Sequence, residues 1–307
     1  MSGPWEGFPH GSVVALRGGV VAQVLALPSP PGMVTVLPKY VLCKEGLWGR
    51  TSTVRLCRVL GDYTVESVEK ATGLVAPRVD GLYGAPMPYV LVSDVVGSVT
   101  PLEACKAVAS GRAPAWAVET LYYAARSTGL AACTELGVTG SVAGGFSHEA
   151  SDLDLVAYVT PSKAPQVYES FSMIGEQERT VIEYTGLFKA KARVGWRRRL
   201  VRGRRVTLTI APESPSSHCP PLAGYYRLQP PEGKVKVEIE VEEGRGEALL
   251  YPPCTPTLQG LYIVSFEYNI AGELYQGGSF TVEGIKAGKA IYIAVRNNAT
   301  SIRRTQA

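Results

Sequence analysis

The apolar residues of the first hundred positions occur in short runs that are broken by glycine and proline. Runs of this kind, rich in valine and leucine, predict strands rather than helices. The expected strands cover residues 13–16, 20–27, 33–37, 54–60 and 89–92. We therefore expect a β-rich N-terminal module over residues 1–98 with little helix.

The pattern changes at Thr100, where Thr100, Pro101 and Glu103 form a capping box with proline at the first helical position. This predicts a helix from Thr100 to about residue 110. A second helix over 115–128 should stop at Gly129. The following segments are expected as strand 135–139, a strand carrying Asp152 and Asp154, helix 162–171 and strand 206–210. Alternating helices and strands indicate an α/β or α+β sheet domain over residues 99–212.

Beyond Pro212 the pattern becomes all-β. Residues 234–242 alternate charged and β-branched side chains, which is typical of a strand with one buried and one wet face. Further strands are expected at 261–268, 279–282 and 290–295, separated by glycine turns. These short strands predict a small barrel or sandwich over 213–307, and a barrel-like domain is our choice. The fold class is thus α+β, with a central mixed sheet between two β-rich units.

Composition narrows the class of protein only modestly. The 307 residues carry a net charge of +4, and their apolar content allows real cores. No membrane-spanning run and no signal peptide is apparent, so we expect a soluble, cytoplasmic protein. Scarce asparagine and abundant valine and arginine favour a heat-adapted source. The six cysteines form no Cys-x-x-Cys pair, which argues against zinc and favours buried thiols; pairing stays open for a hyperthermophile.

The residues with the clearest chemistry lie between positions 140 and 154. Gly140 and Ser141 follow an expected strand, and Asp152 and Asp154 alternate on the next one, so both carboxylates face one side. Paired carboxylates repel unless a cation lies between them, and hard oxygen ligands suit Mg²⁺ or Mn²⁺. The glycine-serine turn would bind the phosphates of a metal-bound triphosphate. The alternative is a surface turn with solvated acids.

This combination resembles the signature of the DNA polymerase beta-like nucleotidyltransferase superfamily. The resemblance implies that Asp152 and Asp154 bind the metal and act in catalysis, while Gly140 and Ser141 contact the phosphates of the incoming nucleotide. A narrower similarity, to a family of predicted archaeal nucleotidyltransferases, involves residues 136–141 and 151–158, with looser matches at 30–40, 251–256, 264–266 and 282–284. It implies the same activity.

The chain departs from the superfamily at the third carboxylate, which a later strand usually supplies. In residues 204–210 the expected position holds Thr207 or Thr209, and threonine is a poor ligand for magnesium. Glu183, on a neighbouring expected strand, is the alternative third acid. Without one, the site would bind a metal-nucleotide with little or no turnover.

A basic run follows the candidate site, with nine basic and no acidic residues between Gly186 and Pro212. We expect six of them to contact phosphate or nucleic acid: Lys189, Lys191, Arg193, Arg197, Arg198 and Arg199. Trp196 is available to stack on a base. The alternative is a solvated, partly structural basic hairpin.

The remaining candidates have simpler interpretations. His148 is expected to face solvent, and the alternative is that it approaches a phosphate or a leaving group. His10 is expected to lie in a mobile terminus, and His218 to have too few partners for a metal site. Tyr122 and Tyr123 are expected in the core or an interface. The sequence favours transfer of a nucleoside monophosphate from a nucleoside triphosphate to a hydroxyl acceptor, with RNA or DNA as candidate acceptors. The alternatives are a weak or inactive nucleotide- or nucleic-acid-binding protein, or a scaffold.

Overall fold

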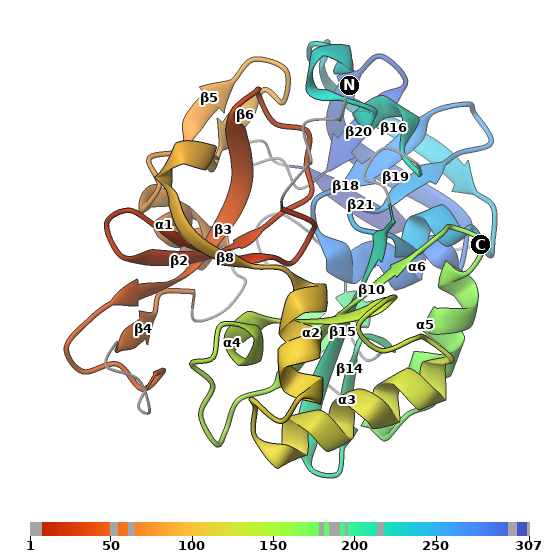
Figure 1. The fold of residues 1–307 in the computed structure, drawn as a ribbon. Coiled ribbons are helices and arrows are strands. Elements are labelled where there is room, and N and C mark those ends of the chain that lie inside the picture. Colours follow the sequence, from red (N-terminus) through yellow and green to blue (C-terminus); the bar gives the residue numbers. More distant parts are fainter. Residues whose placement is uncertain are drawn as a thin grey trace.

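Three large sheets organise the chain in the computed structural model, which describes residues 8–49, 55–60, 65–177, 181–183, 191–193, 196–213, 218–293 and 300–305. In Figure 1 the N-terminal sheet (red to orange) lies at upper left and the C-terminal sheet (blue) at upper right, with the central sheet and its helices below. The mixed α+β class is confirmed. Buried side chains from all three parts, such as Leu27, Leu121 and Leu249, share one continuous core, so the boundaries at 98 and 212 stay a prediction.

The N-terminal sheet has the strand order β4-β3-β2-β1-β8, and β7 pairs with β3. Its strands are β1 (Val13–Leu16), β2 (Val20–Val24), β3 (Met33–Leu42), β4 (Leu56–Arg58), β7 (Tyr89–Leu91) and β8 (Val95–Val99). A small hairpin, β5 (Arg78–Asp80) with β6 (Ala85–Met87), stands beside it. Helix α1 (Val65–Gly73) was not expected: it is amphipathic, but it is short, and it contains few large apolar side chains.

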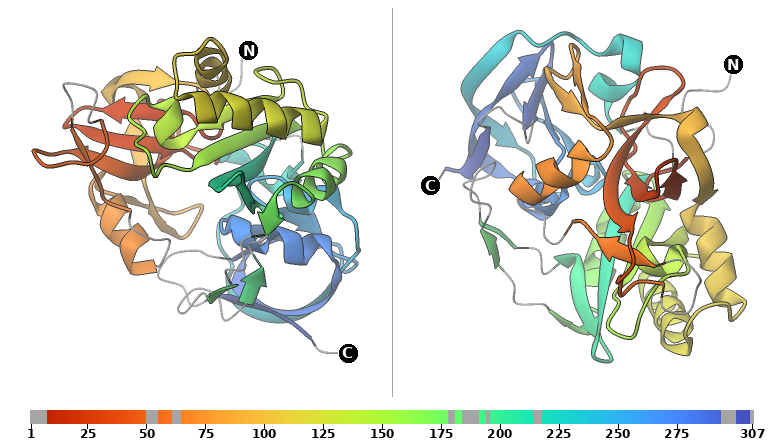
Figure 2. Two further views of the ribbon diagram at one scale, coloured as in Figure 1. Left: turned by 90° about the horizontal axis from the view of Figure 1, so that it is seen from below. Right: turned by 90° about the vertical axis from the view of Figure 1, so that its left-hand side faces the viewer.

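The central sheet has the order β11-β14-β15-β10-β9. Its strands are β9 (Leu136–Thr139), β10 (Leu153–Val159), β11 (Glu176–Gln177), β14 (Arg198–Val201) and β15 (Arg204–Pro212), and a separate hairpin joins β12 (Val181–Glu183) to β13 (Lys191–Arg193). Helices α2 (Pro101–Ala109), α3 (Ala115–Thr128) and α5 (Ala164–Ser172) cover one face, with Leu153 and Leu155 packed among them. Figure 2 shows α3 lying across this sheet.

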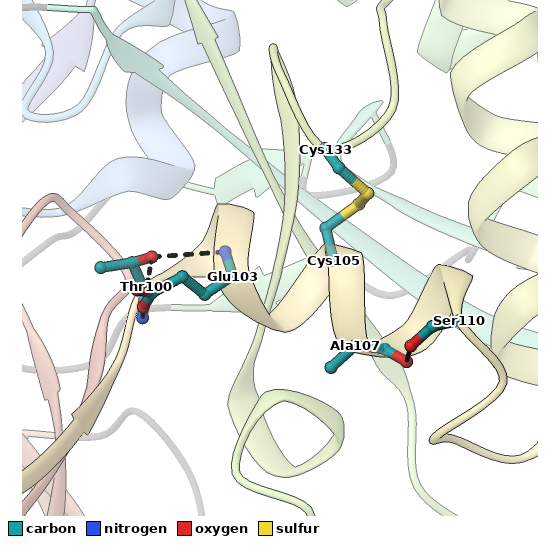
Figure 3. Close-up of a disulfide and its surroundings, with 6 residues drawn as sticks. All are labelled: Thr100, Glu103, Cys105, Ala107, Ser110 and Cys133. Carbon is teal, nitrogen blue, oxygen red and sulfur yellow. Dashed lines mark hydrogen bonds between the residues drawn. A yellow bond between two sulfur atoms is a disulfide. The ribbon is translucent and has the colours of Figure 1, made fainter.

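Helix α2 begins as its sequence predicts. The Thr100 side chain accepts a hydrogen bond from the Glu103 backbone, and the Glu103 carboxylate accepts one from the Thr100 backbone (Figure 3). Helix α3 ends at Gly129, whose φ of 68° is left-handed. The expectation that the two tyrosines of α3 lie in the core was wrong, since Tyr122 is 51% and Tyr123 39% exposed, while their expected place in an interface stays a prediction.

The C-terminal sheet has the order β16-β19-β20-β18-β17, with β21 paired to β19. Its strands are β16 (Gly233–Val241), β17 (Cys254–Pro256), β18 (Tyr262–Ser265), β19 (Gly278–Ala287), β20 (Ala290–Ile293) and β21 (Ser301–Arg304), and the short helix α6 is Ala271–Tyr275. One isolated bridge between Val241 and Thr257 joins the two ends of the curved sheet. The sheet forms a half-barrel, and the closed barrel that the alternation predicts stays a prediction.

The cysteines are paired, and the expectation of free buried thiols was wrong. The disulfides are Cys43–Cys57, Cys105–Cys133 and Cys219–Cys254. Figure 3 shows the second one joining α2 to the segment before β9. The paired cysteines are 14 to 35 residues apart in the sequence, and strand pairing and helix packing bring them together. The spacing of the cysteines along the chain therefore does not predict these disulfides.

The N-terminal segment is fixed rather than mobile from residue 8 onward, which corrects the expectation for His10. His10 is only 5% exposed and stacks on Tyr251 with ring centroids 4.1 Å apart. Its backbone carbonyl accepts a hydrogen bond of 2.6 Å from the Tyr158 hydroxyl on β10. This segment therefore links the first strand to the central sheet. Among the described residues, no helix has the length and apolarity to traverse a bilayer.

Candidate functional site

The turn between β9 and α4 (Gly140–Ala143) requires glycine for two reasons. Gly140 has a φ of 68°, which favours a residue without Cβ. A Cβ at this position would lie 2.3 Å from Oδ2 of Asp154, closer than atoms can approach. Ser141 follows directly and is 4% exposed. The glycine thus lets the Asp154 carboxylate rest against the turn, and the predicted pairing of turn and aspartate is present.

Asp152 and Asp154 lie at the start of β10, where the alternation of the strand separates them from the core. Leu153 and Leu155 are buried among the helices, whereas both aspartates are partly exposed on the opposite side. Within the described part of the chain, neither carboxylate forms an ion pair or a hydrogen bond. Two acids are therefore held side by side without a directly bound protein cation.

Burial is the main cause of the altered acidity in this pair. It raises the pKa of Asp154 to about 6, and the neighbouring charge of Asp152 adds to the effect. The positive charges of Lys39, Arg197 and Arg58 oppose this rise in the pKa of Asp154. The net result is a carboxylate whose charge is insufficiently compensated by the protein, which is the electrostatic setting in which a divalent cation binds favourably.

A threonine, not a carboxylate, lies beside Asp154 on the neighbouring strand. In the parallel pairing of β10 with β15, Asp154 lies opposite Thr207, so their side chains share a face. Thr209 lies opposite Val156, one position further along that face. The described residues contain no cluster of three acids, histidines or cysteines suited to a metal. Glu183 belongs to β12, but its side chain lies outside the described residues.

The N-terminal sheet contributes a wall to the site that the sequence did not reveal. Tyr40 on β3 packs against Phe146 with centroids 4.9 Å apart and against Trp48 at 5.6 Å. Trp48 in turn contacts His148 at 5.1 Å, so His148 is not simply a solvent-facing residue. These rings connect β3 to the loop before Asp152. The only sequence signal was the loose family similarity over residues 30–40.

Two basic residues lie next to Tyr40: Lys39 precedes it on β3, and Arg58 is its partner on β4. Burial raises the pKa of Tyr40 to about 12, with Lys39 and Arg58 opposing the shift and Asp154 and Asp152 adding to it. The Tyr40 hydroxyl is thus close enough to feel both the cations of the N-terminal sheet and the two acids of the central sheet.

The basic run divides into residues with different roles. Arg199 is 7% exposed and donates hydrogen bonds to the carbonyls of Ile174 and Gly175, so it is structural. Arg197 donates to Asn269 at 3.0 Å and lies over the Tyr268 ring at 4.8 Å. For Arg199, the expectation of phosphate or nucleic-acid contact was wrong, because the side chain is buried against the backbone.

Three other predicted contacts cannot be placed. Lys189 lies outside the described residues. Lys191 and Arg193 delimit β13, and their side chains also lie outside what the structure describes. Trp196 is 6% exposed and packs on Tyr168 and Tyr268, which excludes the predicted stacking on a base in this conformation.

His218 is buried and its Nε2 lies 2.9 Å from the carbonyl oxygen of Pro252. Burial lowers its pKa. It stands beside the Cys219–Cys254 disulfide, far along the chain from the aspartates.

Comparison with known proteins adds no further constraint, since no protein-family model, curated protein or solved structure matches the chain. The fold defines a mixed α+β protein with two juxtaposed acids at the start of a central strand. Any more particular assignment rests on the chemistry of that site.

Proposed function

We propose that this protein is a metal-dependent nucleotidyltransferase, which moves a nucleoside monophosphate from a nucleoside triphosphate to a hydroxyl acceptor. The observation that carries the proposal is the position of Asp154 and Asp152 beside the Gly140 turn, with neither acid engaged by a described cation. A structural role for two adjacent, partly buried acids would be expected to include ion-pair partners.

The residues fit a divalent cation. Asp152 and Asp154 supply hard oxygen ligands, and Mg²⁺ or Mn²⁺ normally binds one or two carboxylates and completes its shell with water and phosphate oxygens. When bound, such a cation would neutralise charge on the triphosphate and polarise its phosphoryl group. Gly140 leaves room for the Asp154 carboxylate to lie against the turn, so a cation held by that carboxylate would lie beside the turn backbone, where a phosphate could also bind.

The transfer step follows the usual balance of phosphoryl chemistry. The acceptor oxygen forms a bond to the α-phosphorus, the bond from that phosphorus to its bridging oxygen breaks, and pyrophosphate leaves with the bonding electrons. The hydroxyl proton passes to solvent water. Asp152 and Asp154 would orient the reactants, and Arg197, held by Asn269 near Asp154, would add fixed positive charge.

A second function is favoured by Thr207. This residue stands directly beside Asp154, where the resemblance places an acid, and its hydroxyl neither carries charge nor accepts a proton readily. A protein with this site would bind a metal-nucleotide and turn it over slowly or not at all. The candidate acceptors, RNA and DNA, belong only to the first function.

Both functions are tested with one set of proteins. The wild type, Asp152→Asn and Asp154→Asn are incubated with each α-labelled triphosphate, Mg²⁺ or Mn²⁺, and RNA, DNA or protein acceptors. We expect label transfer by the wild type and loss by at least about 100-fold in both variants. Transfer that survives both substitutions would reject this site. Metal-dependent nucleotide binding without transfer supports the second function.

A further inference from the structure

A row of side chains crosses three strands of the central sheet at the level of Asp154. Thr207 on β15 lies directly opposite Asp154 on β10, and Arg198 on β14 lies directly opposite Thr207. Directly paired residues project from the same face of a sheet. Arg198 therefore stands on the face of the aspartates, two strands away, with only a threonine between.

Arg198 differs from its two neighbours in the sequence. Arg199 points to the opposite face and is held by the Ile174 carbonyl at 2.7 Å, and Arg197 is held by Asn269. Within the described residues Arg198 has no hydrogen bond or ion pair, and its buried Nε has no acceptor. A buried guanidinium nitrogen without an acceptor is costly, because it has lost its water without gaining a partner.

The spacing of the row suits an anion. Adjacent strands are about 4.8 Å apart, so the backbones at Asp154 and Arg198 are separated by about 10 Å. Thr207 lies between Asp154 and Arg198 in this row. An arginine side chain is long enough to reach across a neighbouring strand, so a group bound above Thr207 would lie between residues of opposite charge. A phosphate group is small enough for this position, and arginine binds its oxygens through two parallel N–H donors.

We propose that Arg198 binds the phosphate chain of the nucleotide whose metal is held by Asp152 and Asp154. This inference rests on the proposed function and assigns the triphosphate to the strip between β10 and β14. Arg198 supplies positive charge next to the position where Thr207 replaces an acid. The phosphate is thus held from one side by the metal and from the other by the arginine.

Binding measurements test the assignment without requiring turnover. Calorimetric titration with tripolyphosphate in the presence of Mn²⁺ reports phosphate binding independently of the base. Electron paramagnetic resonance of free Mn²⁺ reports metal binding alone. The variants are Arg198→Ala and Arg198→Lys. The matched control is Arg202→Ala. Arg202 lies in the turn between β14 and β15, and its exposed side chain forms an ion pair of 3.2 Å with Glu119.

We expect Arg198→Ala to weaken tripolyphosphate binding by tenfold to about 100-fold, the loss typical of a charge-assisted pair. Arg198→Lys should retain part of the affinity, and Arg202→Ala all of it. Mn²⁺ binding without phosphate should be unchanged in all three. Circular dichroism identifies any variant that does not fold, in which case Arg198→Lys decides the result.

Unchanged tripolyphosphate affinity in a folded Arg198 variant would overturn the assignment while leaving the proposed function intact. An equal loss in Arg202→Ala would also overturn it, because a general charge effect would then explain the result. Failure of the wild type to bind Mn²⁺ at all would instead reject the proposed function, since the metal site itself would be absent.

Discussion

Oδ2 of Asp154 lies so close to Gly140 that a Cβ there would be 2.3 Å away. The turn and the aspartate are thus fitted to each other, although 14 positions separate them in the sequence. This contact fixes the position of the Asp154 carboxylate relative to the turn, and it makes the glycine testable.

Gly140→Ala should displace the Asp154 carboxylate and weaken Mn²⁺ binding by tenfold or more. Because the φ at this position is 68°, the alanine should also lower the free energy of unfolding by about 1 to 2 kcal/mol. Gly145→Ala is the matched control, because Gly145 has a φ of 70° and open space around its Cα. Equal Mn²⁺ affinity in the two variants would show that the contact is unimportant.

Asp154→Asn should stabilise the metal-free protein. Burial and Asp152 raise the folded pKa from 3.8 to about 6, so the folded state keeps a proton that the unfolded state loses, and stability falls as pH rises through this window. Asparagine removes the penalty, which amounts to at most about 3 kcal/mol above pH 6. Urea unfolding at pH 3.5 and 7.5 measures it. Glu149→Gln, an exposed neighbour, should show no such gain.

Thr207→Asp should restore a third acid beside Asp154. We expect tighter Mn²⁺ binding, faster nucleotidyl transfer if that acid limits the wild type, and a metal-free protein destabilised by about 1 to 3 kcal/mol through repulsion. Thr207→Asn introduces a side chain of nearly the same shape as aspartate but without its charge, so it should increase neither Mn²⁺ affinity nor the transfer rate. Metal affinity that stays at the wild-type value in Thr207→Asp would place the ion away from β15.

His10 should make the fold sensitive to acid. Burial, aided by Lys39 and Arg197, lowers its pKa from 6.5 to about 3, so below pH 6.5 only the unfolded state takes up the proton. Stability should then fall by up to about 1.4 kcal/mol per pH unit. His10→Gln should remove this contribution from the pH profile of unfolding, and an unchanged slope would contradict the buried position.

The disulfides should be detectable and stabilising. Thiol titration of the unfolded, unreduced protein should find no reactive cysteine, because all six are paired. The double variant Cys105→Ala/Cys133→Ala should lose about 3 kcal/mol, as expected for a closed loop of its length. Six titratable thiols in protein prepared without reductant would contradict the pairing.

Much of the fold was predictable from the sequence because its signals are local. The capping box at Thr100 and the glycine stop at Gly129 fix α2 and α3 through backbone hydrogen bonds made within one turn. The alternation of residues 234–242 likewise predicted β16, since a strand presents side chains to two faces in turn. Helix α1 is amphipathic but short and poor in large apolar residues, and it was missed.

The sequence by itself determined the two aspartates, the glycine-serine turn and the absence of an evident third acid, because each depends on residue types at short spacing. The tertiary structure decided which residues complete the site. Strand register placed Thr207 and Arg198 in one row with Asp154, and sheet packing brought Tyr40 and Lys39 to it. Such contacts join residues from different parts of the chain, and only the folded backbone brings them into range.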